Sequence, residues 1–186
     1  MASVTVILEF LNTLNLTAGT DVLSDPPRLA DWLRQEGEHE DLNPSLQDVA
    51  SATELREAIR DLASSNSSGG RPAPAAYEVV DRASRTAAIR LRFSQGRAAE
   101  LEATGPGLEG AVAGMLVALH TVMESGEWAK IKICRNPACR WAYFDRSRNH
   151  SRVWCEMAEC GNRMKARRFR KRRREQPERE KPEGRP

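Results

Sequence analysis

Apolar residues recur at helical spacing through much of the first 128 residues of the chain. Asp25-Pro26-Pro27 is typical of a helix cap and first turn, and residues 28–33 place three apolar side chains on one face. A second helix is predicted to open at Asn43-Pro44, because apolar positions then recur every three or four residues over 46–62. Residues 107–124, GLEGAVAGMLVALHTVME, form an apolar run that predicts a buried helix. The pattern therefore predicts a mainly helical body.

Two stretches depart from the helical pattern. Residues 64–74, SSNSSGGRPAP, have the composition of a flexible linker. In AAIRLRF the alternation is strict and places Ile89, Leu91 and Phe93 on one face of a strand. A turn at residues 94–97 and the following AAELEA predict a return strand, so a β-hairpin is expected here.

Charge divides the chain into two unequal parts. Residues 1–128 contain 10 Lys and Arg against 19 Asp and Glu, a net charge of −9. Residues 129–186 contain 19 basic against 7 acidic residues, a net charge of +12. An acidic body joined to a basic end predicts that the end meets a polyanion. The final residues, 175–186, have the composition of a disordered tail.

All four cysteines lie within the basic part. Four residues separate Cys134 from Cys139 and Cys155 from Cys160, and fifteen residues separate the two pairs. In a reducing compartment such pairs more often bind metal than form disulfides, and thiolate ligands favour zinc over a hard cation. An iron–sulfur cluster and two metal-free buried thiol pairs are the alternatives, but the symmetric short–long–short spacing favours Zn²⁺.

Local patterns around the cysteines predict a small zinc finger. Asn136-Pro137-Ala138 is turn-like and would let a tight knuckle present the first two sulfur atoms. Residues 140–144, RWAYF, read as a short strand, and residues 152–154 are predicted to return beside it. Cys155 would end this hairpin, and Cys160 would lie in the first turn of a helix. Knuckle, hairpin and helix around one zinc form a treble clef, so we expect a helical N-terminal domain (1–128), a C-terminal treble-clef zinc finger (129–174) and a tail (175–186).

The cysteine-rich stretch resembles the CGNR zinc finger, named for the run present here as Cys160-Gly161-Asn162-Arg163. The resemblance covers the residues from Cys134 to about Arg174. Its departures are Val153, where the family commonly has Arg, and Glu156, where a small polar residue is usual. Besides the cysteines, the residues that carry it are Phe144, Asp145, Ser147-Arg148-Asn149, Trp154, Met157 and Lys165.

The N-terminal part is similar to the ABATE domain found with this finger, a name associated with stress-response transcription regulators. Glu9-Phe10-Leu11-Asn12-Thr13 resembles the opening run of that domain, and residues 55–60 resemble its arginine-bearing helix. The resemblance implies a domain that senses a signal or mediates assembly. Assembly would give a homodimer, and sensing would require a small-molecule effector, for which Asn12 and Arg56 are the ligand-binding candidates.

These features together predict a zinc-dependent, DNA-binding transcription regulator. Asn149 and Asn162 are candidates for base edges, and basic side chains are candidates for phosphate contact. An RNA-binding protein and a protein–protein adaptor with a purely structural finger are the alternative functions. The phosphate-contact candidates are Arg146, Arg148, Arg152, Arg163, Lys165, Arg167, Arg168, Arg170 and Lys171.

Other function classes find little support in the sequence. No phosphate-binding glycine loop, nucleophile elbow or HExxH motif is present, and four thiolates leave no open position on zinc, so we expect no enzyme. No apolar run reaches the roughly 18 residues that span a bilayer. The N-terminal stretch lacks a basic region before its apolar residues, so we expect a cytoplasmic protein without a signal peptide.

Overall fold

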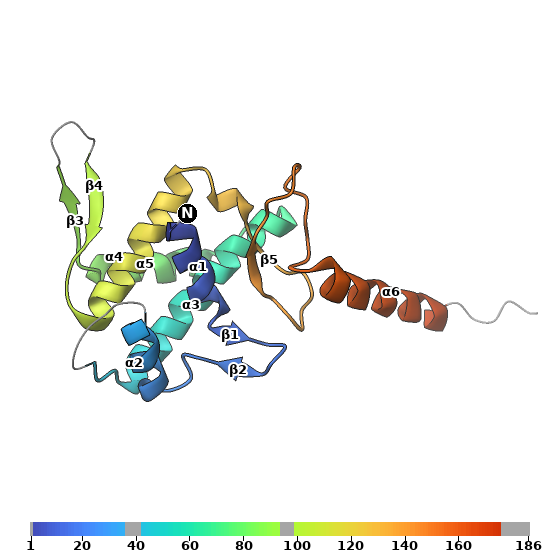
Figure 1. Ribbon diagram of the computed structural model, residues 1–186, viewed down its shortest axis with the longest axis horizontal. Helices are drawn as coiled ribbons and strands as arrows, with labels where there is room; N and C mark the ends of the chain where they lie inside the picture. The colour runs from blue at the N-terminus through green and yellow to red at the C-terminus, as the bar shows by residue number, and fades with distance from the viewer. Residues whose placement is uncertain (1, 36–41, 94–98, 176–186) are drawn as a thin grey trace, which may run out of the picture.

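The computed structural model describes residues 2–35, 42–93 and 99–175 (Figure 1). Helices dominate this part of the chain, and its strands form two-stranded antiparallel sheets, β1–β2, β3–β4 and β5–β6. The mainly helical class with small hairpins is thereby confirmed. The elements in chain order are α1 (Ala2–Asn12), β1 (Leu14–Asn15), β2 (Thr20–Asp21), α2 (Pro26–Gln35), α3 (Leu46–Ser68), α4 (Pro74–Thr86), β3 (Ile89–Arg92), β4 (Glu100–Ala103), α5 (Gly107–Glu124), the 3₁₀ turn η1 (Trp128–Lys130), β5 (Ile131–Ile133), β6 (Ala142–Phe144), the π-helical turn η2 (Met157–Gly161) and α6 (Asn162–Glu175).

Side-chain caps fix where the predicted helices begin. Asp25 accepts a hydrogen bond from the Arg28 N–H at 3.0 Å, which caps α2 as the sequence predicted. The next helix begins slightly later than predicted. Ser45 caps α3 and forms a reciprocal capping box with Asp48, so Asn43-Pro44 precedes the helix.

The predicted linker at residues 64–74 is wrong over its first half. Helix α3 continues through the serine-rich stretch and ends only at Gly69, which has a left-handed φ of 68°. A tertiary contact stabilises this extension, because the Asn66 amide donates to the carbonyls of Trp128 at 2.8 Å and Ile131 at 3.0 Å. The long helix therefore reaches the C-terminal part of the chain.

One hydrophobic core joins the helical body to the first strands of the finger. Helices α1, α2, α3 and α5 supply most of its side chains, and the predicted buried helix at 107–124 is confirmed as α5. Ile131 and Ile133 of β5 and Ala142 of β6 belong to the same core. Apolar surface is thus buried across the predicted boundary at residue 128, and these burials stabilise both parts together.

The β3–β4 hairpin projects from the end of the body opposite to α6 (Figure 1). Its register pairs Ile89 with Ala103 and Leu91 with Leu101, which confirms the predicted strands. The predicted turn at residues 94–97 lies outside the described residues. Leu91 is 60% exposed, so the apolar face of this ribbon is only partly covered.

The strand pairing in the finger differs from the predicted one. Strand β6 pairs with β5, with Ile131 opposite Phe144 and Ile133 opposite Ala142, so the hairpin brackets the knuckle rather than following it. Residues 152–154 form no strand, although the Val153 carbonyl accepts from the Arg135 N–H at 3.1 Å. Strand β6 pairs with β5 rather than with residues 152–154, because β5 can bury Ile131 and Ile133 in the core beside α3 at the same time. Helix α6 then leads away from the body, and the predicted tail after Glu175 lies outside the described residues (Figure 1).

Candidate metal centre and basic helix

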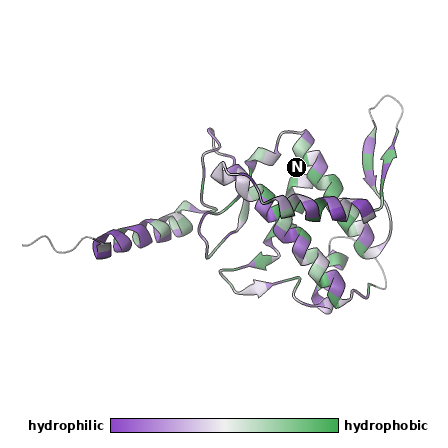
Figure 2. Cartoon of the chain, turned by 180° about the vertical axis from the view of Figure 1, so that it is seen from behind, coloured by the Kyte–Doolittle hydropathy of each residue, from purple (hydrophilic) through white to green (hydrophobic). Residues whose placement is uncertain are grey.

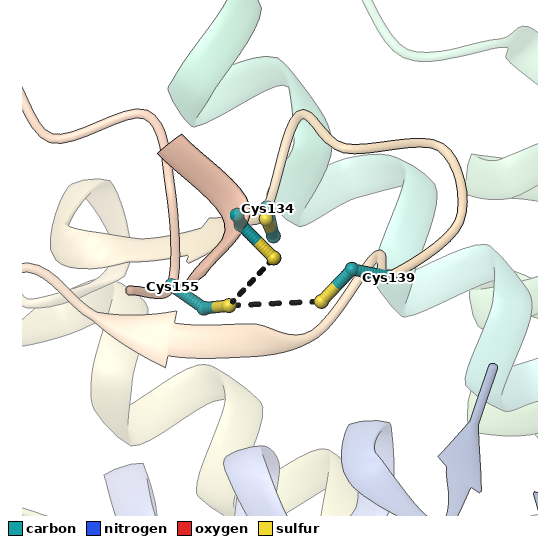
Figure 3. Close-up of side chains that lie close together, drawn as sticks. Cys134, Cys139 and Cys155 are labelled. Atoms are coloured by element: carbon teal, nitrogen blue, oxygen red, sulfur yellow. Dashed lines mark hydrogen bonds between the residues drawn. The ribbon is translucent and has the colours of Figure 1, made fainter. Parts of the chain in front are cut away.

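The four cysteines converge on one point between the knuckle and the start of the last helix. All four Sγ atoms lie within 4.8 Å of one another, and Figure 3 shows Cys134, Cys139 and Cys155 turned toward a common centre. The Sγ of Cys155 lies 3.6 Å from that of Cys139 and 3.7 Å from that of Cys160. None of the four forms a disulfide.

This geometry fits tetrahedral zinc. Zinc–thiolate bonds of about 2.3 Å at tetrahedral angles place sulfur atoms about 3.8 Å apart, close to the two measured separations. The cluster therefore forms a zinc site with four thiolate ligands, as predicted. Such a site is coordinatively closed, so its zinc supplies folding free energy rather than an open catalytic position.

The thiols differ in how readily they lose their protons before metal binds. Burial raises the pKa of Cys139 and of Cys155. Burial alone would also raise the pKa of Cys160, but hydrogen bonds outweigh it, first among them one from the Asn136 amide at 3.5 Å, and the pKa is lowered. Asn136 also shapes the knuckle, since its carbonyl accepts from the Cys139 N–H at 2.9 Å and the Arg140 N–H at 3.0 Å. The predicted turn at 136–138 is thereby confirmed.

Gly161 permits the close packing of the segment that carries Cys160. The turn η2 is π-helical, and it is followed directly by α6. A Cβ at Gly161 would clash with Sδ of Met157 and would lie 3.3 Å from Cδ1 of Trp154. The glycine of the C-G-N-R run therefore lets the Met157 and Trp154 side chains pack directly against the backbone of this turn.

Aromatic side chains cover the metal site from the hairpin side. Tyr143 is buried with the cysteines, and Trp141 and Trp154 are partly buried against them. Arg152 folds over the Tyr143 ring, with its guanidinium carbon 5.1 Å from the ring centre. The three aromatic residues thus pack around the metal site.

A buried ion pair organises the loop that carries several candidate residues. Lys132 Nζ donates to Asp145 Oδ2 at 2.8 Å and also to the His150 carbonyl, and both members of the ion pair are buried. The Asp145 carboxylate further accepts from the Ser147 N–H and hydroxyl and from the Arg152 N–H. Burial by itself would raise the pKa of Asp145, but these hydrogen bonds hold it well below its usual value, so the group is ionised at neutral pH.

The candidate nucleic-acid residues fall into two groups. On the loop, Arg146, Arg148 and Asn149 are exposed. Arg152 is engaged, because its guanidinium donates to the carbonyls of Trp154 and Cys155. Contact with nucleic acid stays a prediction for this group.

The second group lies on α6. Asn162 donates to the Ala158 carbonyl at 2.9 Å, and Arg163 lies 4.0 Å from Glu159. The basic side chains of α6 are exposed, and Figure 2 shows the helix as almost continuously hydrophilic. The sequence predicted these candidates, but it did not show how their helix projects from the body. The candidates on this helix are Asn162, Arg163, Lys165, Arg167, Arg168, Arg170 and Lys171.

The two ligand-binding candidates both have partners within the protein. Asn12 donates to the Ala142 carbonyl at 3.0 Å and accepts from the Ala142 N–H at 2.8 Å, which ties α1 to β6. Arg56 is buried and forms a bidentate ion pair with Asp21 at 2.6 and 2.9 Å, besides donating to the Thr13 hydroxyl at 3.1 Å. Binding of an effector by these two residues stays a prediction, and it would have to replace these contacts.

Sequence reasoning missed Arg60, which joins the body to the knuckle. The side chain is 1% exposed and donates to the carbonyls of Leu11 and Arg140, the latter at 2.8 Å. Arg140 directly follows Cys139 and has a left-handed φ of 51°, and its carbonyl accepts this hydrogen bond from α3. Two arginines four residues apart on an otherwise apolar helix face were the available signal.

Replacing Asn12 by alanine is expected to destabilise the chain by about 1–3 kcal/mol, because the Ala142 N–H and carbonyl lose their partners in a partly buried site. Chemical denaturation measures this loss. Asn15→Ala is the matched control, since Asn15 accepts from the Thr17 and Ala18 N–H groups in an exposed turn. Equal losses in the two variants would contradict the tie between α1 and β6.

Comparison with known protein families gives two matches. Residues 5–124 match the ABATE family, described as "Putative stress-induced transcription regulator", and residues 130–173 match the CGNR zinc finger. Comparison with curated proteins gives no match. None of the helices among the described residues is both long and apolar enough to cross a membrane.

Proposed function

Because the chain belongs to the ABATE family and carries a CGNR zinc finger, we propose that this zinc-binding regulator acts on transcription by binding duplex DNA. The observation that carries the proposal is the basic helix α6. It has nine Lys and Arg among its 14 residues, and it extends away from the acidic body (Figure 1). A charge run on this scale supplies the phosphate attraction on which DNA binding depends.

The dimensions of α6 favour duplex DNA over duplex RNA. A 14-residue helix is about 21 Å long, and the major groove of B-DNA admits an α-helix. The major groove of A-form RNA is too deep and narrow for side chains to read. Recognition of single-stranded RNA would use exposed rings, whereas Tyr143, Trp141 and Trp154 are packed against the cysteines.

The exposed loop at 146–149 is connected through residues 150–154 to Cys155, and the metal site joins Cys155 to Cys160 at the start of α6. In this proposal α6 supplies phosphate contacts and the loop residues Arg148 and Asn149 contact base edges. The zinc is structural, since it fixes the knuckle, and thereby the loop, against the start of the helix. The acidic body would repel a phosphate backbone, so we assign to it sensing or assembly.

Affinity for duplex DNA is expected to fall steeply with salt, and the slope should depend on α6. Replacing Arg172, Arg173 and Arg174 by glutamine should reduce the slope of log affinity against log salt by up to about 2.7, at about 0.9 for each phosphate that is no longer neutralised. Fluorescence anisotropy with a labelled duplex of about 20 base pairs at several salt concentrations measures the slope, with an RNA duplex of equal length in parallel.

The matched control changes the same number of charges on the body. Arg82, Arg85 and Arg90 are exposed, and their replacement by glutamine should leave the slope unchanged. Equal slopes for the two triple variants would show that net charge alone attracts DNA and would contradict the role of α6. Tighter binding to the RNA duplex would replace DNA by RNA as the target.

A further inference from the structure

An open groove of about 630 Å³ runs between α3, α4, α5 and η1, on the body and away from the cysteines. Leu62 and Leu119 are buried at its base, while Tyr77 and Met123 are exposed at its rim. Trp128 of η1 is a further aromatic wall. The volume lies within the range of small-molecule sites, and the lining is apolar with a few polar groups, as in such sites.

The charge of the groove limits what it could bind. Among the described residues that line it, Asp81 is the charged one. Asp81 lies 3.3 Å from Arg85, but both side chains are about two-thirds exposed, so this pair is weak and open to exchange. The lining hydroxyls of Ser65 and Ser84 donate to backbone carbonyls at 2.7 Å, so neither offers its proton to an anion. A carboxylate beside two aromatic rings instead suits a cation.

We propose that this groove binds an aromatic small molecule that carries one positive charge. Its rings would pack against Trp128 and Tyr77 over the apolar base, and its charge would lie near Asp81. Desolvated aromatic surface would supply most of the affinity, and the carboxylate would discriminate against anions.

The groove also adjoins the segment that connects the body to the finger. The Trp128 carbonyl accepts from Asn66 at 2.8 Å, and the same amide donates to Ile131 at the start of β5. Two residues after Trp128, the Lys130 carbonyl accepts from the Asp145 N–H at 2.7 Å, and Asp145 organises the basic loop. An occupant in contact with Trp128 therefore biases the position of the loop. This regulatory step rests on the proposed function, whereas binding to the groove does not.

Tetraphenylphosphonium and tetraphenylborate test the site, because they match in size and shape and differ in the sign of their charge. Isothermal titration calorimetry on the full chain should show one phosphonium ion bound, about tenfold tighter than the borate at the groove. Tyr77→Ala and Asp81→Asn change exposed side chains and should each weaken phosphonium binding about fivefold. Glu78→Gln makes the same charge change on the same helix outside the groove and should have no effect.

The outcomes separate the parts of the proposal. If the borate binds to the basic finger, its affinity will not change in Tyr77→Ala. An affinity that does change in Tyr77→Ala and Asp81→Asn therefore identifies binding in the groove. If no phosphonium binds, or if Glu78→Gln weakens its binding as much as Asp81→Asn does, the groove is not the site. Either result leaves the proposal of DNA binding unaffected. Bound phosphonium should change the Kd for duplex DNA at least about threefold in the unaltered chain and not in Tyr77→Ala. Binding without this change overturns the coupling.

Discussion

Replacing Cys155 by alanine is expected to release the zinc, weaken DNA binding and lower the thermal stability of the whole chain. Structural zinc contributes about 10–16 kcal/mol of apparent free energy to small fingers, and loss of one of four thiolates removes most of it. The loop after β6, η2 and the start of α6 should become accessible to protease first. Strands β5 and β6 should stay protected longer, because Ile131, Ile133 and Ala142 belong to the core of the body.

Metal content and thiol reactivity measure this result together. The chain has no cysteine outside the site, so a thiol reagent should find no reactive group in the zinc-loaded protein and four after chelation. Zinc measured by mass spectrometry should fall from one ion per chain to none in the variant. Arg34→Ala, which changes an exposed side chain of α2 paired with Asp31, should keep its zinc. A variant that retains native protease resistance without metal would refute the dependence of the finger on zinc.

Replacing Asp145 by asparagine is expected to cost about 3–5 kcal/mol, because it leaves the Lys132 ammonium buried without its counter-charge. The carboxylate also holds the Ser147 and Arg152 N–H groups, so the loop that carries Arg148 should lose its order. Equilibrium unfolding of the zinc-loaded protein measures the stability, and amide hydrogen exchange over residues 145–152 measures the order.

The double variant Lys132→Met/Asp145→Asn separates the charge from the hydrogen bonds. Removing both charges should recover part of the stability, since the unpaired ammonium is gone, while the loop stays loosened. Arg148→Ala is the control on the same loop, and its exposed side chain predicts a change within about 0.5 kcal/mol. If Asp145→Asn is as stable as the double variant, the unpaired Lys132 charge does not lower stability, which would contradict the role of the buried ion pair.

The sequence was sufficient for the features with local causes. The spacing of the four cysteines predicted the zinc ligands, since a tetrahedral site needs two close pairs. The apolar run at 107–124 predicted α5 at its observed limits, because a long and mostly apolar segment leaves little ambiguity. The helix predicted to begin near Cys160 is present as η2 and α6, and α6 extends from the body because its basic side chains leave no apolar stripe to pack on it.

Features with distant causes were not predictable from the sequence. Strand β6 pairs with β5 because β5 can bury its isoleucines against α3. A three-residue strand shows too little alternation for the sequence to reveal this pairing. The serine-rich end of α3 read as a linker because its helical state depends on Asn66 contacting residues more than 60 positions away. The roles of Arg56, Arg60 and Lys132 follow from acceptors on other elements. The spacing of the two arginines on an apolar helix face is visible in the sequence, but their acceptors are not.

The continuous core beneath the zinc site has a consequence for how such proteins can diverge. A finger cut out at residue 130 and joined to an unrelated body would carry an isoleucine strand with nothing to cover it and a knuckle without the arginine of α3. Recombination of whole fingers between family members should therefore succeed only where the recipient keeps matching side chains on α1 and α3. The two segments are expected to be inherited as a pair, with new binding preferences arising by substitution on the loop and α6 rather than by exchange of the finger.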